Sequence, residues 1–183
     1  MSLPVGHSLA GYIFYDYKPL LFFNRAWHSF LFIVMLSNLP DIDFLPGLIV
    51  GEPNLYHHGI SHSLGAALVV GIIFGFIFKK KTNFFTVFFF TSSIYYSHVL
   101  IDFFTEDLRK PIGIMLFWPL NDIYYSSPVP LFAKTIRAST TKDFFPSLFN
   151  LHNFLAIIRE VIVMSVVILI YRFIKKIFRP LKR

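Results

Sequence analysis

An all-α, polytopic integral membrane helical bundle is the fold class that this sequence predicts. The 183-residue chain is 55% hydrophobic and only 15% charged, and its mean hydropathy of +0.62 is too high for an ordinary soluble domain. Aromatic residues make up 19% of the chain, with 24 Phe, which suits helices that face acyl chains. Basic residues flank the apolar runs, as they commonly flank membrane-spanning segments.

We expect about four to five membrane-embedded helices in a single membrane-embedded domain over residues 1–183, with an irregular extracytoplasmic cap. In chain order, the predicted parts are a helical hairpin at 5–39, a metal-site loop at 40–62, a second helical hairpin at 62–104, the cap at 105–153, and a C-terminal membrane helix with a basic tail at 154–178.

Three long apolar runs give the clearest membrane helices. Residues 64–78 and 84–101 are joined by Lys79-Lys80-Lys81-Thr82-Asn83, and residues 154–174 form the third run. The run 64–78 is shorter than the ~20 residues that cross the hydrocarbon core. We therefore expect its helix to begin near His62, at the membrane interface.

Two shorter apolar segments, 5–17 and 26–39, predict the first hairpin, which Pro40 ends. The predicted cap is rich in helix-breaking residues and poor in long apolar runs. Its prolines are Pro111, Pro119, Pro128, Pro130 and Pro146.

Basic residues near span ends favour the cytoplasmic side of a membrane. One set of helix ends carries most of them, namely Lys18, Arg25, Lys79, Lys80, Lys81, Arg172, Lys175, Lys176, Arg179, Lys182 and Arg183. The opposite ends are rich in Asp and Glu. We therefore predict a multi-pass protein of the plasma (inner) membrane, with a cytoplasmic C-terminus and its conspicuous His and Asp residues on the extracytoplasmic side.

The composition also excludes several functions. The net charge of +7 lies at the ends of apolar runs rather than on a polar face, so we expect no nucleic-acid partner. Without Cys, a metal must be held by His, carboxylate or carbonyl groups. The chain has no G-x-S-x-G elbow, P-loop, Rossmann fingerprint or H-E-x-x-H motif.

Ionisable groups near membrane depth are costly and are commonly paired or functional. His98 and Asp102 are four residues apart, so a helix would point both to one face. They could bind one metal ion, or the His could simply donate to the carboxylate. Asp41 and Asp43 follow a helix end, and in extended backbone they would point to one side. The alternative for this pair is a solvated turn with a helix cap.

Three histidines, His57, His58 and His62, come just before the apolar run 64–78. His57 and His62 are five apart, about 140° around an ideal helix, so they cannot share a helical face. His58 and His62 are four apart and could share one, which leaves His57 and His58 as competing ligands. Gly59 permits the close turn that either arrangement needs. We expect His28 and His152 to be packing residues at the interface.

Together these side chains offer enough nitrogen and oxygen ligands for one or two divalent ions. Mixed imidazole and carboxylate ligands suit zinc, manganese or iron better than magnesium. An ion so held would lower the pKa of a bound water towards ~7 and polarise a phosphoryl or carbonyl oxygen. Hydrolysis by metal-activated water is therefore the chemistry that the residues favour.

The order of these blocks resembles the YdjM-like family of inner-membrane-associated metal-dependent hydrolases, whose founding member is described as LexA-binding. The family pattern is an early His, then P-D-x-D, H-[RH]-G-x-[ST]-H-S, S-H-x-x-x-D and G-[IV]-x-x-[LF]-W-P. It reads here as His7, Pro40-Asp41-Ile42-Asp43, His57-His58-Gly59-Ile60-Ser61-His62-Ser63, Ser97-His98 with Asp102, and Gly113-Ile114-Met115-Leu116-Phe117-Trp118-Pro119.

The resemblance implies a shared ligand set: His7, Asp41, Asp43, His57, His62, His98 and Asp102. This chain has His58 where the family commonly has Arg, so His58 becomes a phosphate-facing base or a spare ligand. The ligand order is also similar, more distantly, to that of zinc-dependent phospholipases C. The chain lacks their final H-x-x-x-E pair, so we expect one or two ions rather than three.

These expectations favour a membrane-bound hydrolase that cleaves a phosphoester in a membrane lipid or a lipid-linked molecule. In that hypothesis Asp41, His57, His62 and His98 hold metal, Asp43 or Asp102 bridges metals or takes a proton from water, and Arg109, Lys110 or His58 receives the phosphate. The alternatives are a divalent metal transporter or sensor, and a non-catalytic scaffold stapled by metal.

Overall fold

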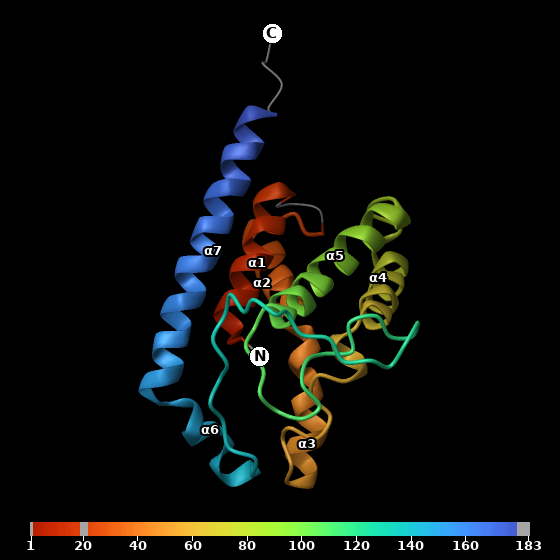
Figure 1. Cartoon of the computed structure of the whole chain (residues 1–183). Coiled ribbons are helices and arrows are strands. Elements are labelled where there is room, and N and C mark those ends of the chain that lie inside the picture. The colour runs from red at the N-terminus through yellow and green to blue at the C-terminus, as the bar shows by residue number, and fades with distance from the viewer. Residues whose placement is uncertain (1, 19–21, 179–183) are drawn as a thin grey trace.

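The computed structural model describes residues 2–18 and 22–178 (Figure 1). These residues form helices and irregular segments, and no strand forms among them. In chain order the elements are α1 (Pro4–Tyr17), α2 (Ala26–Ser37), η1 (Leu39–Asp43), α3 (Phe44–Val50), η2 (Ile60–His62), α4 (Leu64–Phe78), α5 (Phe84–Phe103), α6 (Thr141–Leu148) and α7 (Leu151–Ile177). The all-α prediction is confirmed.

Local signals account for where several helices begin. Pro4 stands in the first turn of α1, where its missing N–H costs nothing. The side chains of Ser63, Asn83 and Asn150 accept hydrogen bonds from the first turns of α4, α5 and α7. The helix expected to begin near His62 therefore begins at Leu64, because Ser63 is its cap.

Two helices, α5 and α7, are long and apolar enough to cross a membrane. A third span is possible by the same criteria if α2 and the following 39–50 stretch count as one segment, bent by 55°. Helix α4 has 15 residues and is apolar but shorter. The structure thus gives two to three candidate spans, and the count of four to five membrane-embedded helices stays a prediction.

The ends rich in basic residues lie together at one end of the molecule, shown at the top of Figure 1. There Lys175 Nζ lies 2.6 Å from the Asp16 carboxylate and 2.7 Å from its carbonyl oxygen, which joins α7 to α1. Lys81 Nζ donates to Phe22 O at 3.4 Å. Of the predicted basic set, Arg179, Lys182 and Arg183 fall outside the described residues.

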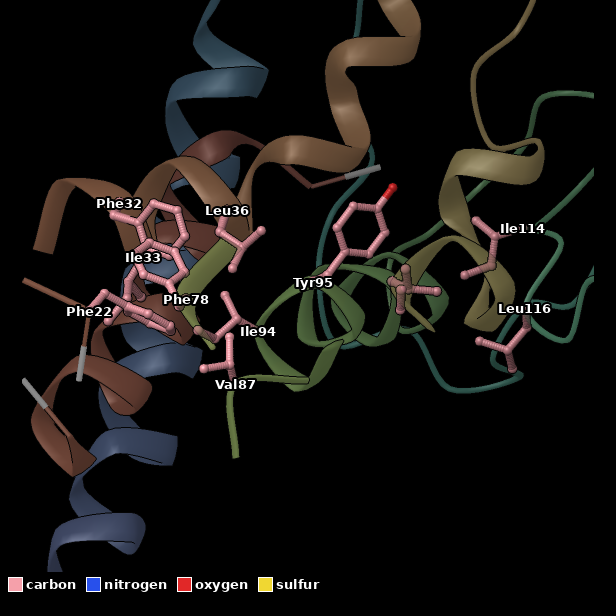
Figure 2. Close-up of a cluster of buried hydrophobic side chains, with 12 residues drawn as sticks. Phe22, Phe32, Ile33, Leu36, Phe78, Val87, Ile94, Tyr95, Ile114 and Leu116 are labelled. Carbon is pink, nitrogen blue, oxygen red and sulfur yellow. The ribbon is translucent and has the colours of Figure 1, made fainter. Parts of the chain in front are cut away.

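Packing at this end is aromatic. The Phe22 ring lies 4.8 Å from Phe32, 5.1 Å from Phe78 and 5.7 Å from Phe90, measured between ring centroids. These rings come from four separate segments and share a core with Ile33, Leu36, Val87 and Ile94 (Figure 2). We call this group the aromatic end.

The segment between α5 and α6 has no helix and forms two isolated bridges, Thr105 with Phe132 and Ile114 with Tyr125. Its G-I-M-L-F-W-P block lies across the start of α4, where Leu116 O and Trp118 O accept the N–H groups of Leu64 and Gly65 at 3.0 and 2.8 Å. These carbonyls satisfy donors that a helix start leaves free. A Cβ at Gly65 would lie 2.7 Å from the Trp118 ring, so this close contact requires glycine.

Candidate metal centre

Four side chains converge at the helix ends opposite those that carry the basic residues. Asp41 comes from η1, His62 from η2, and His98 and Asp102 from the last turns of α5. His62, His98 and Asp102 are buried, and the Asp41 side chain is 15% exposed. We call these four residues the metal cluster.

The distances within the metal cluster fit one small cation. His62 Nε2 and His98 Nε2 are 3.2 Å apart. Asp41 Oδ1 lies 3.5 Å from each of these nitrogens, and Asp102 Oδ2 lies 3.3 and 3.2 Å from them. Tetrahedral ligands at the usual zinc distances lie about 3.3–3.6 Å from one another. These five distances are those expected within a tetrahedral donor set.

Two carboxylate oxygens of the cluster that lack hydrogen-bond partners also indicate a metal site. Asp41 Oδ1 and Asp102 Oδ2 are buried and have no hydrogen-bond partner, although buried carboxylate oxygens normally have one. These are the two oxygens that face the histidine nitrogens. A divalent cation would satisfy both, so the residues present fit a metal ion.

Each histidine of the cluster is held through its other ring nitrogen. His98 Nδ1 donates to Ser37 O at 2.9 Å, which leaves Nε2 free to bind an ion. His62 Nδ1 lies 3.1 Å from Asp43 Oδ2 and 3.0 Å from Ser61 Oγ. Such outer partners fix ring orientation and raise ligand basicity in metal sites.

The extended backbone expected for Asp41 and Asp43 is wrong, although their carboxylates still come close enough together to share an ion with His57. Both lie in the 3-10 helix η1, where Pro40 occupies the first turn. Residues two apart in such a helix differ by about 240°. Asp41 consequently reaches the metal cluster, whereas Asp43 reaches the far sides of His62 and His57. Asp43 also forms, with Asp41 and His57, a second group that could hold an ion.

His57 and His58 both lie in irregular backbone before η2, so the argument from shared helical faces does not apply to them. His57 Nδ1 lies 2.9 Å from Asp43 Oδ1, and His58 Nδ1 lies 3.4 Å from Asp107 Oδ2. The Nε2 atom of each ring is buried without a hydrogen-bond partner. With His62, these two rings make a third group of possible ligands, and the choice between them stays open.

The backbone at His58 is unusual. Its φ of 69° is the only positive value at a non-glycine residue within 2–18 and 22–178, and such conformations cluster at functional sites. Gly59, expected to supply the turn, has a φ of −79°. The left-handed residue is thus the histidine itself.

His7 lies beside the metal cluster and is not one of its four residues. Its ring stacks on His98 with centroids 3.5 Å apart, and its Nε2 lies 3.6 Å from Asp102 Oδ1. Ser2 donates its N–H to the same Asp102 oxygen at 2.9 Å and lies 2.8 Å from His7 Nε2. His7 and Ser2 together occupy the side of Asp102 that faces away from the other ligands.

The cluster concentrates negative charge that calls for a cation. Burial alone would lower the pKa of His62, but the close approach of three carboxylates, that of Asp102 foremost, raises it well above its usual value. Burial lowers the pKa of His58 to about 4 despite its bond to Asp107. Positive charge is therefore favoured at the metal cluster itself and disfavoured at the neighbouring His58 ring.

A cavity of about 810 Å³ adjoins the cluster, and Asp43, His57, His58 and Ser61 are in its lining. Four basic residues also line it: Arg109, Lys110, Lys134 and Arg137. Arg137 is buried and donates from Nε to Asn54 Oδ1 at 2.6 Å, while Arg109 donates to Arg137 O at 2.5 Å. Because Asp43, Glu106 and Asp107 also line it, the cavity combines imidazole rings with charged groups of both signs.

Sequence reasoning missed several of these partners. Asp107, Ser61 and Ser2 hold His58, Asp43 and Asp102, but no spacing rule links residues so far apart in the chain. The signal for Ser61 lay inside the H-H-G-I-S-H-S block. The His28 ring lies 3.8 Å from the Trp27 ring and is tilted by 35° to it, and His152 donates to Lys134 O at 2.8 Å. Both lie outside the cluster, as expected.

Comparison with known proteins agrees with the order of motifs. A family model described as YdjM inner membrane protein matches residues 1–178. No curated protein and no solved structure matches the chain. The match takes in every residue of the metal cluster and all of the candidate spans. This chain therefore belongs to the YdjM family of inner membrane proteins.

Proposed function

We propose that this protein is a membrane-bound metal-dependent hydrolase that cleaves a phosphoester of a lipid or lipid-linked substrate, with the site on the extracytoplasmic side. The observation that carries the proposal is the cavity, where four basic side chains lie beside a cluster whose donors match one cation. A phosphate group is the ligand that Arg and Lys side chains recognise best.

The residues have distinct roles in this proposal. Asp41, His62, His98 and Asp102 hold the ion. A divalent ion bound there would polarise a phosphoryl oxygen and lower the pKa of a water molecule. Asp43 orients His57 and His62 through its two oxygens.

His58 is the group best placed to accept a proton from the attacking water. Its Nδ1 faces Asp107, which favours the proton on that nitrogen and leaves Nε2 as an acceptor. Arg109 and Lys134 receive the phosphate oxygens from the cavity wall. Their positive charge then stabilises the negative charge that develops as the ester bond breaks.

The test is release of soluble phosphate compounds from phospholipid vesicles that contain the purified protein and zinc. His98→Ala should abolish release because it removes one donor of the cluster. His28→Ala is the matched control, since His28 lies at the aromatic end, and it should keep wild-type turnover. Unchanged turnover by His98→Ala would overturn the proposal.

A non-catalytic scaffold is the second candidate, and one observation favours it. Four protein ligands already complete a tetrahedron, and closed four-ligand sites are commonly structural. In that case an ion would staple η1, η2 and α5 together. The two functions differ in whether the bound ion keeps an exchangeable water, which water-proton relaxation of the manganese-loaded protein measures.

A further inference from the structure

Helix α7 carries one carboxylate in the middle of its apolar length. Glu160 is fully buried, although charged groups at this depth are costly. Its two oxygens accept hydrogen bonds from the backbone N–H groups of Leu3 and Gly6, the latter at 2.8 Å. The carboxylate thus closes the first turn of α1, where helix N–H groups have no partner of their own.

The residue next to this contact reaches the metal cluster. Ser2 is fully buried, its N–H donates to Asp102 Oδ1 at 2.9 Å, and its Oγ lies 2.8 Å from His7 Nε2. Asp102 Oδ1 is the oxygen opposite the one that faces His62 and His98. Ser2 therefore sets the direction of a proposed ligand from its far side.

Glu160 and Ser2 act on the same turn of chain. Glu160 fixes the backbone at Leu3, directly after Ser2, and at Gly6, directly before His7. Its carboxylate packs closely there, since a Cβ on Gly6 would lie 3.2 Å from Oε2. The hydrogen bonds of Glu160 thus restrain the backbone from which both Ser2 and His7 approach Asp102.

The position of α7 beside α1 depends on polar contacts. Burial of apolar surface does not drive helices together in lipid, so packing and hydrogen bonds must do so. Besides Glu160, the contacts of Asp16 with Lys175 and Tyr171 join these helices at the basic end. Most of the apolar length of α7 is exposed, and the start of the helix is held by further hydrogen bonds, such as those of Asn153 with the backbone of Ile136.

We propose that Glu160 is a positioning residue of the metal cluster, which it reaches through the first turn of α1. It holds the backbone where Ser2 orients Asp102, and it thereby ties the geometry of the cluster to the placement of α7. This inference rests on the metal binding that the proposed function requires, but not on hydrolysis.

The test measures the zinc affinity of the full-length protein in detergent, by competition with a chromophoric chelator. Glu160→Gln weakens the two N–H contacts, and Ser2→Pro removes the N–H that Asp102 accepts. Each should lower zinc affinity about 10-fold or more, as the loss of an outer partner does in other metal sites. The double variant should lose less than the product of the two single losses, because Glu160 acts through the turn of chain that carries Ser2.

Ser165→Ala is the matched control, since Ser165 is exposed on the same helix, and it should bind zinc like the wild type. Wild-type affinity in Glu160→Gln, or a double variant whose losses multiply, would overturn the proposal. If Glu160→Gln does not fold, Glu160→Asp carries the test with the same expectation, because its shorter side chain cannot reach both N–H groups.

The outcomes for this inference and for the proposed function can be told apart. A protein that binds zinc as described but hydrolyses no phosphoester supports this inference and overturns the proposed function. A wild-type protein that binds no zinc overturns both.

Discussion

The two ends of the molecule are built on different physical principles. At the aromatic end, rings from four segments pack by contact alone, and Phe22 touches three other phenylalanines. At the metal cluster, three of the four side chains are held by a specific partner: His98 by Ser37 O, His62 by Asp43, and Asp102 by Ser2. The aromatic end requires apolar side chains of suitable size, whereas the metal cluster requires specific polar atoms at fixed positions.

This difference predicts how each end responds to substitution. A Phe core tolerates another apolar side chain of similar size. A buried polar group that loses its partner pays the full cost of desolvation. Changes at the cluster should therefore affect metal binding strongly, and changes at the aromatic end should affect stability alone.

The largest effect is expected for Asp102→Asn. The amide replaces the carboxylate that lies nearest both histidine nitrogens, so zinc affinity should fall more than about 100-fold, beyond the range for an outer partner. Elemental analysis after dialysis measures this loss. Asp122→Asn, at an exposed position, should keep its zinc, and zinc retention by Asp102→Asn would remove Asp102 from the cluster.

Asp43→Asn should have the next largest effect. Asp43 contacts the Nδ1 atoms of His57 and His62, so its loss should weaken zinc binding about 10- to 100-fold. Chelator competition provides the measurement, with exposed Asp143→Asn as the control. A loss as complete as that of Asp102→Asn would instead place Asp43 among the ligands, as the family resemblance implies.

Phe32→Leu tests the aromatic end. The ring is buried against Phe22, Phe74 and Phe78, and the swap should lower the free energy of unfolding in detergent by about 1 kcal/mol. Zinc affinity should stay at the wild-type value. Phe89→Leu, at an exposed ring, should change neither quantity. A fall in zinc affinity in Phe32→Leu would show that the two ends are coupled.

The smallest effect is expected for Asp107→Asn and depends on pH. Burial alone would raise the pKa of Asp107, but hydrogen bonds with His58 and the N–H groups of Arg109 and Gly113 lower it below its usual value. Its contribution to stability is therefore present above the unfolded pKa of ~3.9 and is lost as pH falls below it. The melting temperature of the variant should fall less than that of the wild type between pH 5 and 3. An equal fall in the melting temperatures of the variant and the wild type between pH 5 and 3 would contradict this role of Asp107.

The helices could be predicted well because their signals are local. The apolar run 64–78 coincides with α4, although the helix was expected to begin two residues earlier, near His62; Ser63 caps it and lysines follow it. Helix α7 extends three residues beyond each end of the predicted 154–174. The extra turn at its start follows from the Asn150 cap, a signal that hydropathy alone does not contain.

The candidate site could be predicted in its residues but not in its arrangement. The i, i+4 spacing correctly placed His98 and Asp102 on one face of α5, because a helix has one geometry. The roles of Asp41 and Asp43 depended on a 3-10 turn, and those of His57 and His58 on a left-handed residue. Partners such as Asp107 are set by tertiary contact, which no short motif encodes.

The positions of the four donors along the chain also determine when the cluster becomes complete during synthesis. Its four donors lie between residues 41 and 102, and the last belongs to the final turn of α5. A chain still on the ribosome has an incomplete chelator until that turn has been made. An ion could therefore bind the complete donor set only after α1 to α5 have been synthesised.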